Sequence, residues 1–157
     1  MRKIIIVGSA PGGAKQAKAW LRKNKGAAVC LINEEIAAWR GPADFAATLH
    51  PEKLPDWLVR ATHVSPLQKS GRTKPAAPTT IWTRESITYH RAVGTSAHLA
   101  VIAAIQNGFD AVALAGATMD GPYAMARPIW ERAKRDGEIE ALTEVLTDGW
   151  LKGLIHG

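Results

Sequence analysis

The amino-acid sequence predicts an α/β fold of the Rossmann-like, doubly wound type, with a mostly parallel sheet of about five or six strands and helices on both faces. The first observation behind this prediction is the β-branched run Ile4–Val7, which is typical of a strand buried on both faces of a parallel sheet. The second is that such apolar runs alternate with segments of helical periodicity, as in βαβ units. The third is size, because 157 residues with 46% hydrophobic content suit one compact core. We therefore expect a single domain over residues 1–157.

The first half of the chain alternates between strand and helix patterns. Ala14, Ala17 and Leu21 recur at helical spacing, and Gly26 stands where such a helix would stop. An apolar run follows at once, which completes a strand-helix-strand unit. The expected elements are a strand at residues 4–7, a helix at 14–25, strands at 27–32 and 44–49, a short helix at 55–59 and a short strand at 61–64.

The middle of the chain breaks this pattern. Residues 65–80 contain prolines, a glycine and several cations but no periodic apolar face, so they predict a mobile loop. Beyond it, Thr95 or Ser96 can cap a helix. The elements expected there are a helix at 95–105, a strand at 109–115, a helix from about 128 to 136, a final amphipathic helix at 139–146, and a tail that packs Trp150, Leu151 and Leu154 back on the sheet.

Charge and composition point to the class of partner. The formal net charge of +6 makes anionic partners, nucleic acid among them, an expectation. Cations are concentrated at residues 15–25 and 69–91, and acidic residues at 131–148. The run Ile4–Val7 is too short for a signal core or a membrane span, so we expect a cytoplasmic protein with no membrane partner. Cys30 is expected to be an inert buried thiol, and the oligomeric state is left open.

The glycine-rich segment Gly8-Ser9-Ala10-Pro11-Gly12-Gly13 lies directly between a buried strand and a helix. A helix start offers N–H groups without partners and a positive dipole end, and glycine lets a phosphate approach the backbone closely. The spacing is neither G-x-G-x-x-G nor that of a P-loop. We predict that this turn binds phosphate, with a purely structural tight turn as the alternative.

Further candidate residues follow the other expected strands, where open parallel sheets gather ligand groups. Asn33 follows the second strand and is either a ligand to a ribose or base or an N-cap, and the neighbouring Glu34 is a candidate for a ribose hydroxyl. Thr48 and His50 end the third strand. The other candidates are Thr95 and Ser96 as an anion cradle or ordinary cap, Gly116 and Tyr123 as walls of a nucleoside pocket, and Asp120 as a carboxylate for a metal or for proton transfer.

Several familiar sites have no counterpart in the sequence. The five histidines show no H-x-x-x-H spacing and the single cysteine cannot build a zinc site, so no metal ligands are assigned. There is no G-x-S-x-G elbow. His98, beside apolar neighbours on an expected helix, is interpreted as structural, and His156 would have to fold back to act as a base.

The ordered set of motifs resembles a known fold family. The motifs are Gly8-Ser9-Ala10-Pro11-Gly12, Asn33, Gly94-Thr95-Ser96, Asn107-Gly108-Phe109-Asp110 and Leu114-Ala115-Gly116. Together they resemble the sialyltransferase-like nucleotide-binding fold, shared by bacterial CMP-sialic acid transferases and archaeal hydroxymethylpterin pyrophosphokinase-like proteins. The likeness is greater to small phage and prophage proteins of that fold, which end in a motif similar to Asp148-Gly149-Trp150-Leu151-Lys152-Gly153-Leu154.

This resemblance implies a nucleotide or nucleotide-sugar ligand and a small glycosyl- or pyrophosphoryl-transferase. Gly8, Ser9, Ala10, Gly12 and Asn33 would hold the nucleotide, and Thr95, Ser96 and Gly116 would contact its other side. Two departures weaken the implied catalysis: Ser9 stands where the transferases usually have asparagine, and only His156 is roughly placed to match their histidine base. The alternative is a non-catalytic phage accessory protein that binds nucleic acid or a protein partner through its basic face.

Overall fold

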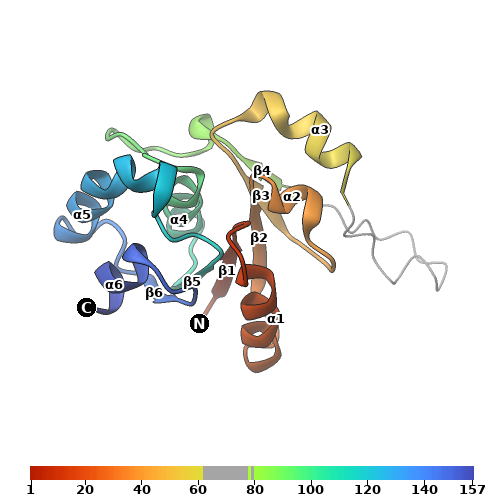
Figure 1. Ribbon diagram of the computed structural model, residues 1–157, viewed down its shortest axis with the longest axis horizontal. Coiled ribbons are helices and arrows are strands. Elements are labelled where there is room, and N and C mark those ends of the chain that lie inside the picture. The colour runs from red at the N-terminus through yellow and green to blue at the C-terminus, as the bar shows by residue number, and fades with distance from the viewer. Residues whose placement is uncertain (62–77, 79) are drawn as a thin grey trace.

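The structure is a computed structural model that describes residues 1–61, 78 and 80–157. It confirms the predicted α/β class, with a six-stranded, all-parallel sheet in the order β4-β3-β2-β1-β5-β6 (Figure 1). The strands are β1 (Lys3–Val7), β2 (Ala28–Ile32), β3 (Phe45–Ala47), β4 (Thr80–Trp82), β5 (Ala111–Ala115) and β6 (Leu142–Val145). The α-helices are α1 (Gly13–Lys23), α2 (Glu35–Ala38), α3 (Leu54–Val59), α4 (Ser96–Gln106), α5 (Arg127–Arg135) and α6 (Trp150–His156), and the short 3-10 helices include η1 (Pro51–Lys53), η3 (Arg84–Ser86) and η4 (Gly121–Ala126).

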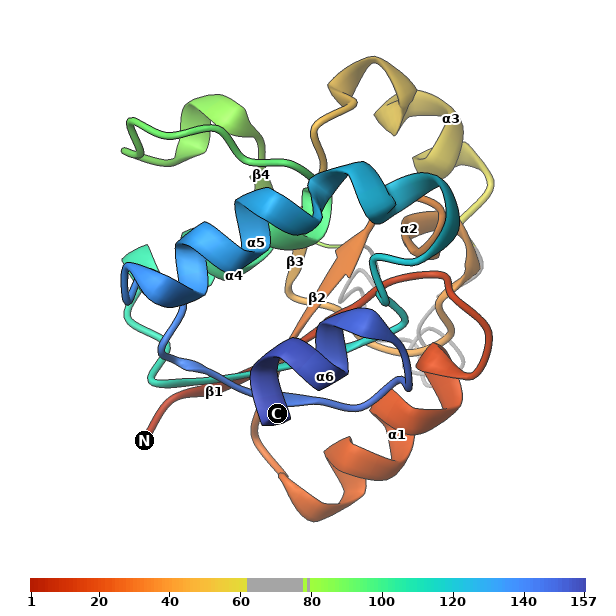
Figure 2. The ribbon, with the colours of Figure 1, turned by 60° about the vertical axis from the view of Figure 1, so that its left-hand side comes forward.

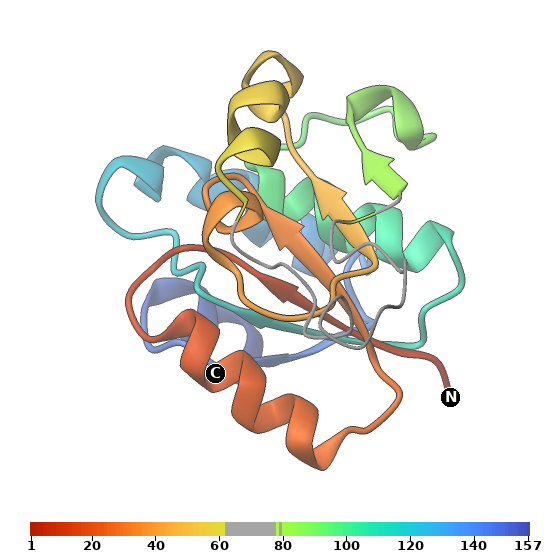
Figure 3. The same ribbon diagram turned by 90° about the vertical axis from the view of Figure 1, so that its right-hand side faces the viewer.

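The helices form a layer on each face of the sheet. Figure 1 shows α4, α5 and α6 on one side and α1, α2 and α3 on the other; α5 and α6 come toward the viewer in Figure 2, and α1 and α3 do so in Figure 3. The burial of β1 on both faces explains why its residues after Lys3 are apolar: Ile4 and Ile6 belong to the core under α4, whereas Ile5 and Val7 belong to the core under α1. Each residue of this central strand therefore contacts one helical layer.

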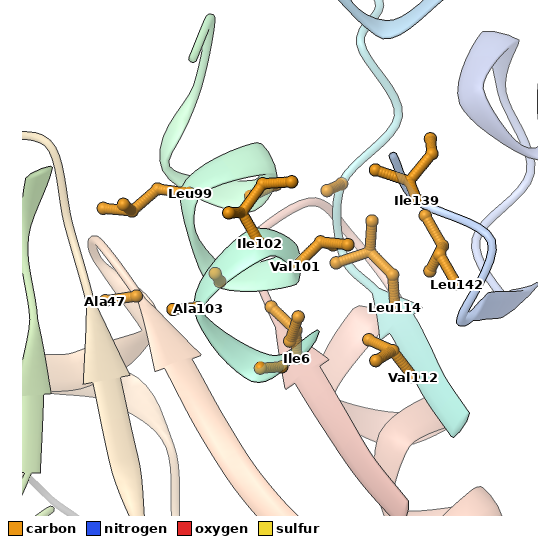
Figure 4. Close-up of a cluster of buried hydrophobic side chains, with 14 of the residues drawn as sticks. Ile6, Ala47, Leu99, Val101, Ile102, Ala103, Val112, Leu114, Ile139 and Leu142 are labelled. Carbon is orange, nitrogen blue, oxygen red and sulfur yellow. The ribbon is translucent and has the colours of Figure 1, made fainter. Parts of the chain in front are cut away.

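Helix α4 is the centre of one core. Its residues from Ser96 to Ala104 are all buried, so it has no solvent-facing stripe over that length. Figure 4 shows Leu99, Val101 and Ile102 among side chains from the sheet, including Ile6 and Leu114. Because these contacts surround α4, the direction of its N-terminus is fixed by the core.

The predicted final helix at 139–146 is wrong, because residues 142–145 form the edge strand β6. A β-bulge explains the misleading pattern. Val112 pairs with Leu142 but the next residue, Ala113, pairs with Glu144, so one residue of β6 is extra. The bulge lets Leu142 and Val145, three residues apart, both be buried, which imitates helical spacing. The predicted tail packing is confirmed, because Leu151 is fully buried in the core and Trp150 and Leu154 pack against it.

Two other predictions concern the middle of the chain. The helix predicted at 55–59 is confirmed as α3. The predicted loop at 65–80 extends too far, because Thr80 begins β4, where Thr80–Trp82 pairs with β3. The rest of that loop other than Pro78, and the strand predicted at 61–64 apart from Ala61, lie outside the described residues. In the part of the chain that the structure describes, no helix has the length and apolar character needed to cross a membrane.

Candidate functional site

The chain reverses its winding direction at β1, which lies between β2 and β5. In open parallel sheets, ligands bind outside the carboxyl ends of the strands at such a switch point. A cavity of about 680 Å³ lies there, bounded by the ends of β1, β2 and β5, the start of α4, and η4. We call it the carboxyl-edge cavity. In Figure 3 the arrowheads of the strands point toward this edge of the sheet.

The structure brings most of the predicted site residues to this cavity. Gly12, Gly13 and His156 are not among the described residues that line it. Thr48 lies behind Asn33, to whose Oδ1 it donates a hydrogen bond from Oγ1 at 2.9 Å. The predicted residues that do line the cavity are Gly8, Ser9, Ala10, Asn33, Glu34, His50, Thr95, Ser96, Gly116, Asp120 and Tyr123.

Three amides of the glycine-rich turn after β1 donate hydrogen bonds to backbone carbonyls of the protein. The amide of Gly8 donates to the carbonyl of Ala115 at 2.8 Å, that of Ala10 to Gly116 at 3.0 Å, and that of Gly13 to Ala10 at 3.1 Å. These three N–H groups therefore already have protein acceptors. The hydrogen bonds hold the turn against the end of β5. Gly8, Ser9 and Ala10 of this turn form part of the cavity wall.

The glycines at this junction are required by close backbone packing. Gly116 has a φ of +74°, and a Cβ there would lie 2.0 Å from the carbonyl oxygen of Gly8. A Cβ on Gly13 would lie 2.4 Å from the Cα of Gly116. Because real carbon and oxygen atoms cannot approach so closely, only glycine fits, and the two loops stay in contact.

The start of α4 supplies N–H donors to the opposite wall. Thr95 is the N-cap, with an extended backbone, and its Oγ1 accepts from the amide of His98 at 3.3 Å. Ser96 Oγ accepts from the amide of Leu49 at 3.0 Å, which ties the segment after β3 to the helix. Thr95, Ser96 and Ala97 all line the cavity. The first turn of an α-helix has N–H groups without intrahelical acceptors and a positive dipole end, so this wall can bind an anion.

Asn33 has a positive φ of 52°, a conformation that asparagine adopts more readily than most residues. It is therefore not the N-cap of α2, which is Glu34. The side chain is oriented by Thr48, whose hydroxyl donates to Asn33 Oδ1 and accepts from the amide of His50. With its oxygen paired, the Asn33 amide retains N–H donors for a ligand in the cavity.

Glu34 lies at the end of β2 and is held by two donors. Trp57 Nε1 donates to Oε1 at 3.0 Å and Arg60 donates to Oε2 at 3.3 Å. The Trp57 hydrogen bond is the main reason why the pKa of Glu34 is lowered, so the group is a carboxylate at neutral pH. A carboxylate in this position can accept a hydrogen bond from a sugar hydroxyl.

Asp120 has a structural role at the rim of the cavity. Its Oδ1 accepts from Arg127 at 2.8 Å, and its Oδ2 accepts from the amide of Trp150, the first residue of α6, at 3.3 Å. The carboxylate thus joins the segment before η4 to α5 and α6. Both oxygens of Asp120 are therefore engaged in holding the fold together at this rim.

The two histidines singled out from the sequence lie in different places. His156 Nε2 accepts from the amide of Val145 at 2.9 Å, so the ring is bound to β6 rather than paired with Asp120. His98 is fully buried on α4, and neither ring nitrogen has a hydrogen-bond partner in the described part of the chain. Burial is the main reason why its pKa is lowered to about 4, which keeps the ring neutral. This burial agrees with a structural histidine.

Sequence reasoning missed several residues of the cavity because they come from other elements. Lys53, at the end of η1, is the only lysine or arginine among the described residues that line it. Trp57 on α3 and Met119 are buried, whereas Tyr123 and Met125 on η4 are 55% and 85% exposed. Sequence reasoning had identified Tyr123, but the apolar rim that it forms with Met125 depends on how η4 packs. Lys53, Trp57 and Met125 do not directly follow a strand, so their position in the sequence gave no signal.

Among residues 1–61, 78 and 80–157, no group of three or more histidine, cysteine or acidic side chains is placed to hold a metal ion. No protein-family model, curated protein or solved structure matches this chain. The functional argument therefore depends on the geometry of the carboxyl-edge cavity.

Proposed function

We propose that this protein binds a phosphate-bearing nucleotide or nucleotide-sugar in the carboxyl-edge cavity. The observation that carries the proposal is the orientation of α4, whose N-terminal residues Thr95, Ser96 and Ala97 line the cavity at the switch point of the sheet. The phosphate lies at this helix start, with Lys53 as the nearby cation. This differs from the site predicted at the Gly8–Gly13 turn, where three amides already have acceptors.

The remaining walls suit a nucleoside or sugar. Asn33 and Glu34 offer a donor and an acceptor for hydroxyl or base groups, on the side of the cavity formed by β2. Tyr123 and Met125 supply an exposed aromatic and apolar rim against which a base can pack. A volume of about 680 Å³ lies within the range of small-molecule sites.

Transfer chemistry is not part of this proposal. The resemblance to sialyltransferase-like proteins implies it, but the two candidates for proton transfer are not brought together. Asp120 is bound to Arg127 and α6, and His156 is bound to β6. The geometry supports binding at this cavity through groups that are in place.

A thermal-shift panel tests the proposal with CMP, CDP, UDP, ATP, GTP, CMP-sialate and NAD. A ligand that binds only the folded state, at about 100 times its Kd, stabilises the protein by about 2.7 kcal/mol and raises the melting temperature. We expect at least one phosphate-bearing member to do so, and the parent nucleoside without phosphate to have a much smaller effect. If no member of the panel shifts the melting temperature, the proposal is wrong.

Lys53→Gln is the variant that tests the phosphate position. Removing one charge-assisted contact should weaken nucleotide binding about fivefold to tenfold, measured by calorimetric titration. Lys152→Gln is the matched control, because Lys152 is a partly exposed lysine on α6, bound to Asp148 and outside the described lining of the cavity. If Lys53→Gln and the native chain bind the nucleotide equally well, the phosphate does not lie near Lys53 and its proposed position is wrong.

A further inference from the structure

A second cavity lies at the opposite edge of the sheet, where the strands begin. Its volume is about 560 Å³, and its lining comes from the starts of β1, β2 and β3, the turn after α1, and Phe109, two residues before β5. We call it the amino-edge cavity. Four of its lining residues are cations, namely Arg2, Lys3, Lys23 and Lys25.

Two carboxylates lie near these four cations: Asp44 lines the cavity, and Asp110 Oδ2 accepts from the backbone amide of Arg2 at 2.8 Å. None of them forms an ion pair with a carboxylate in the part of the chain that the structure describes. Lys3 Nζ donates to the neutral side chain of Asn24 at 3.0 Å. Asp44 is the carboxylate that lines the cavity, and its Oδ2 accepts from the amide of Val29. Among the described lining residues, four cations face the one carboxylate of Asp44, so the cavity carries an excess of positive charge.

Some of these cations also have a structural role at the C-terminal ends of helices. Lys23 lies in the last turn of α1, where a cation complements the helix dipole. Arg2, just before β1, donates from Nη1 to the carbonyl of Asn107, the C-cap of α4, at 2.6 Å, and Lys3 donates to the side chain of Asn24, the C-cap of α1. Lys25 lies beyond the end of α1. The fold thus brings cations from two distant parts of the sequence to one concave surface.

Other clusters of cations in the structure are neutralised, which makes this one distinctive. Arg91 binds both Asp136 and Glu138, and Arg132 binds Glu138. The positive charge that the sequence places at residues 15–25 has no comparable ion pairs among the described residues. Three exposed cations of α1, at positions 15, 18 and 22, follow one face of the helix toward Lys23 and Lys25.

Two phenylalanine rings form the inner wall of the amino-edge cavity, where the core begins. The Phe109 ring lies under the Arg2 guanidinium, whose central carbon is 4.2 Å from the ring centroid. Phe45 is half-buried, lines the same cavity and stacks on Trp82 at 4.3 Å between centroids. Because these rings pack in or against the core, they shape the wall of the cavity, and the exposed cations are the groups that can contact an anion.

A lipid surface fits these observations less well. The large apolar side chains that are exposed in the described residues lie on α3 and η4, except for Met1. The amino-edge cavity and the exposed face of α1 thus offer charge without a row of apolar side chains to insert. We propose that the amino-edge cavity, continued by the cations of α1, binds the phosphodiester backbone of a nucleic acid.

The test is fluorescence anisotropy with a labelled single strand of about 20 nucleotides and with its duplex, from about 50 to 300 mM salt. We expect binding at low salt by at least one of the two probes, weakening steeply as salt rises. Vesicles of phosphatidylcholine with phosphatidylserine form a third arm. The proposal is overturned if neither oligonucleotide binds at the lowest salt, or if the vesicles bind as tightly as the better oligonucleotide.

The double variant Lys23→Gln, Lys25→Gln tests whether the oligonucleotide binds at the amino-edge cavity. Removing two phosphate contacts should weaken binding about tenfold at low salt and reduce the slope of log affinity against log salt by about 2. The matched control is Arg135→Gln, Lys152→Gln, which removes the same charge from exposed ion pairs on α5 and α6. If both double variants weaken binding equally, net charge alone is responsible and the proposed site is wrong. Melting curves of both variants verify that each is folded.

This inference does not depend on the nucleotide proposal. The oligonucleotide assay reports on the amino edge of the sheet, whereas Lys53→Gln and the nucleotide panel report on the carboxyl edge. Either result can fail while the other holds.

Discussion

Single backbone positions decide whether the loops after β1 and β5 can meet. We predict that Gly116→Ala lowers the free energy of unfolding by about 3 kcal/mol or more, because the new Cβ has a positive φ and collides with the Gly8 carbonyl. Gly12→Ala is the control, since Gly12 has a similar φ of +85° but open space around its missing Cβ. That variant should lose only about 1–2 kcal/mol, from the left-handed conformation alone. Urea unfolding of the two variants measures the difference, and equal losses would contradict the packing argument.

His98 makes the stability of the fold depend on pH. The ring faces Tyr89 and Trp130, and the charges nearest to it are Arg132, which lowers its pKa, and Glu138, which raises it. Burial is the largest cause, and together with Arg132 it outweighs Glu138 and lowers the pKa from 6.5 to about 4. The unfolded chain therefore binds a proton before the folded one does, so stability is present above about pH 6.5 and is lost as pH falls toward 4.

The corresponding variant is His98→Leu, which has no titratable group. Between about pH 7.5 and pH 5, the native chain should lose about 2 kcal/mol of unfolding free energy more than this variant loses. Urea unfolding at the two pH values gives the comparison. At neutral pH the variant should be about as stable as the native chain, because the nitrogens that it removes have no partners among the described residues. If both proteins lose the same free energy of unfolding between the two pH values, groups other than His98 cause the loss.

Residue-level reasoning from sequence predicted that several residues gather at the carboxyl edge, and the structure places them there; their role in binding stays a prediction. Gly8, Asn33 and Gly116 were found because each follows a buried strand, and the parallel sheet brings such positions together. What the glycines do was not visible, since the approach of Gly116 to Gly8 joins residues far apart in the sequence. Lys53 was missed because its place in the cavity depends on how η1 and α3 pack.

At the scale of elements, the best predicted segments are those whose burial agrees with their local pattern. β1, α1, β2, α4 and β5 have both a clear apolar pattern and glycine or polar residues at their ends, and the structure has each of them at or near the predicted residues. β6 was mistaken for a helix because its bulge gives buried residues at a spacing of three. β4 is a short edge strand next to a proline-rich segment, and its pairing with β3 is a tertiary contact that no local pattern reveals.

The direction of the helices also explains why the two edges of the sheet differ in chemistry. Helix α4 begins at the carboxyl edge, where its N–H groups attract an anion, and α1 ends at the amino edge, where cations complement the helix dipole. Both arrangements follow from the direction of the helices in a right-handed βαβ unit. The same topology therefore produces an N–H-lined cavity at one edge and a lysine-rich cavity at the other.

For the whole molecule, the two proposals together predict two independent sites. β1 extends from the amino-edge cavity, at Lys3, to the carboxyl-edge cavity, at Gly8. A strand of this length spans roughly 16 Å, which exceeds the Debye length of about 8–10 Å at moderate salt. An anion at one edge should therefore have little electrostatic effect on the other, and the rigid core between them offers no alternative packing to couple them.

The measurement is oligonucleotide affinity by anisotropy, with and without a saturating concentration of the nucleotide identified by thermal shift. We expect the two affinities to agree within about twofold, because a coupling free energy near zero leaves each site unchanged. Lys53→Gln should likewise leave oligonucleotide affinity unaltered, and the Lys23→Gln, Lys25→Gln variant should leave nucleotide affinity unaltered. Competition between the nucleotide and the oligonucleotide would mean that both occupy one site, and the assignment of separate edges would then have to be abandoned.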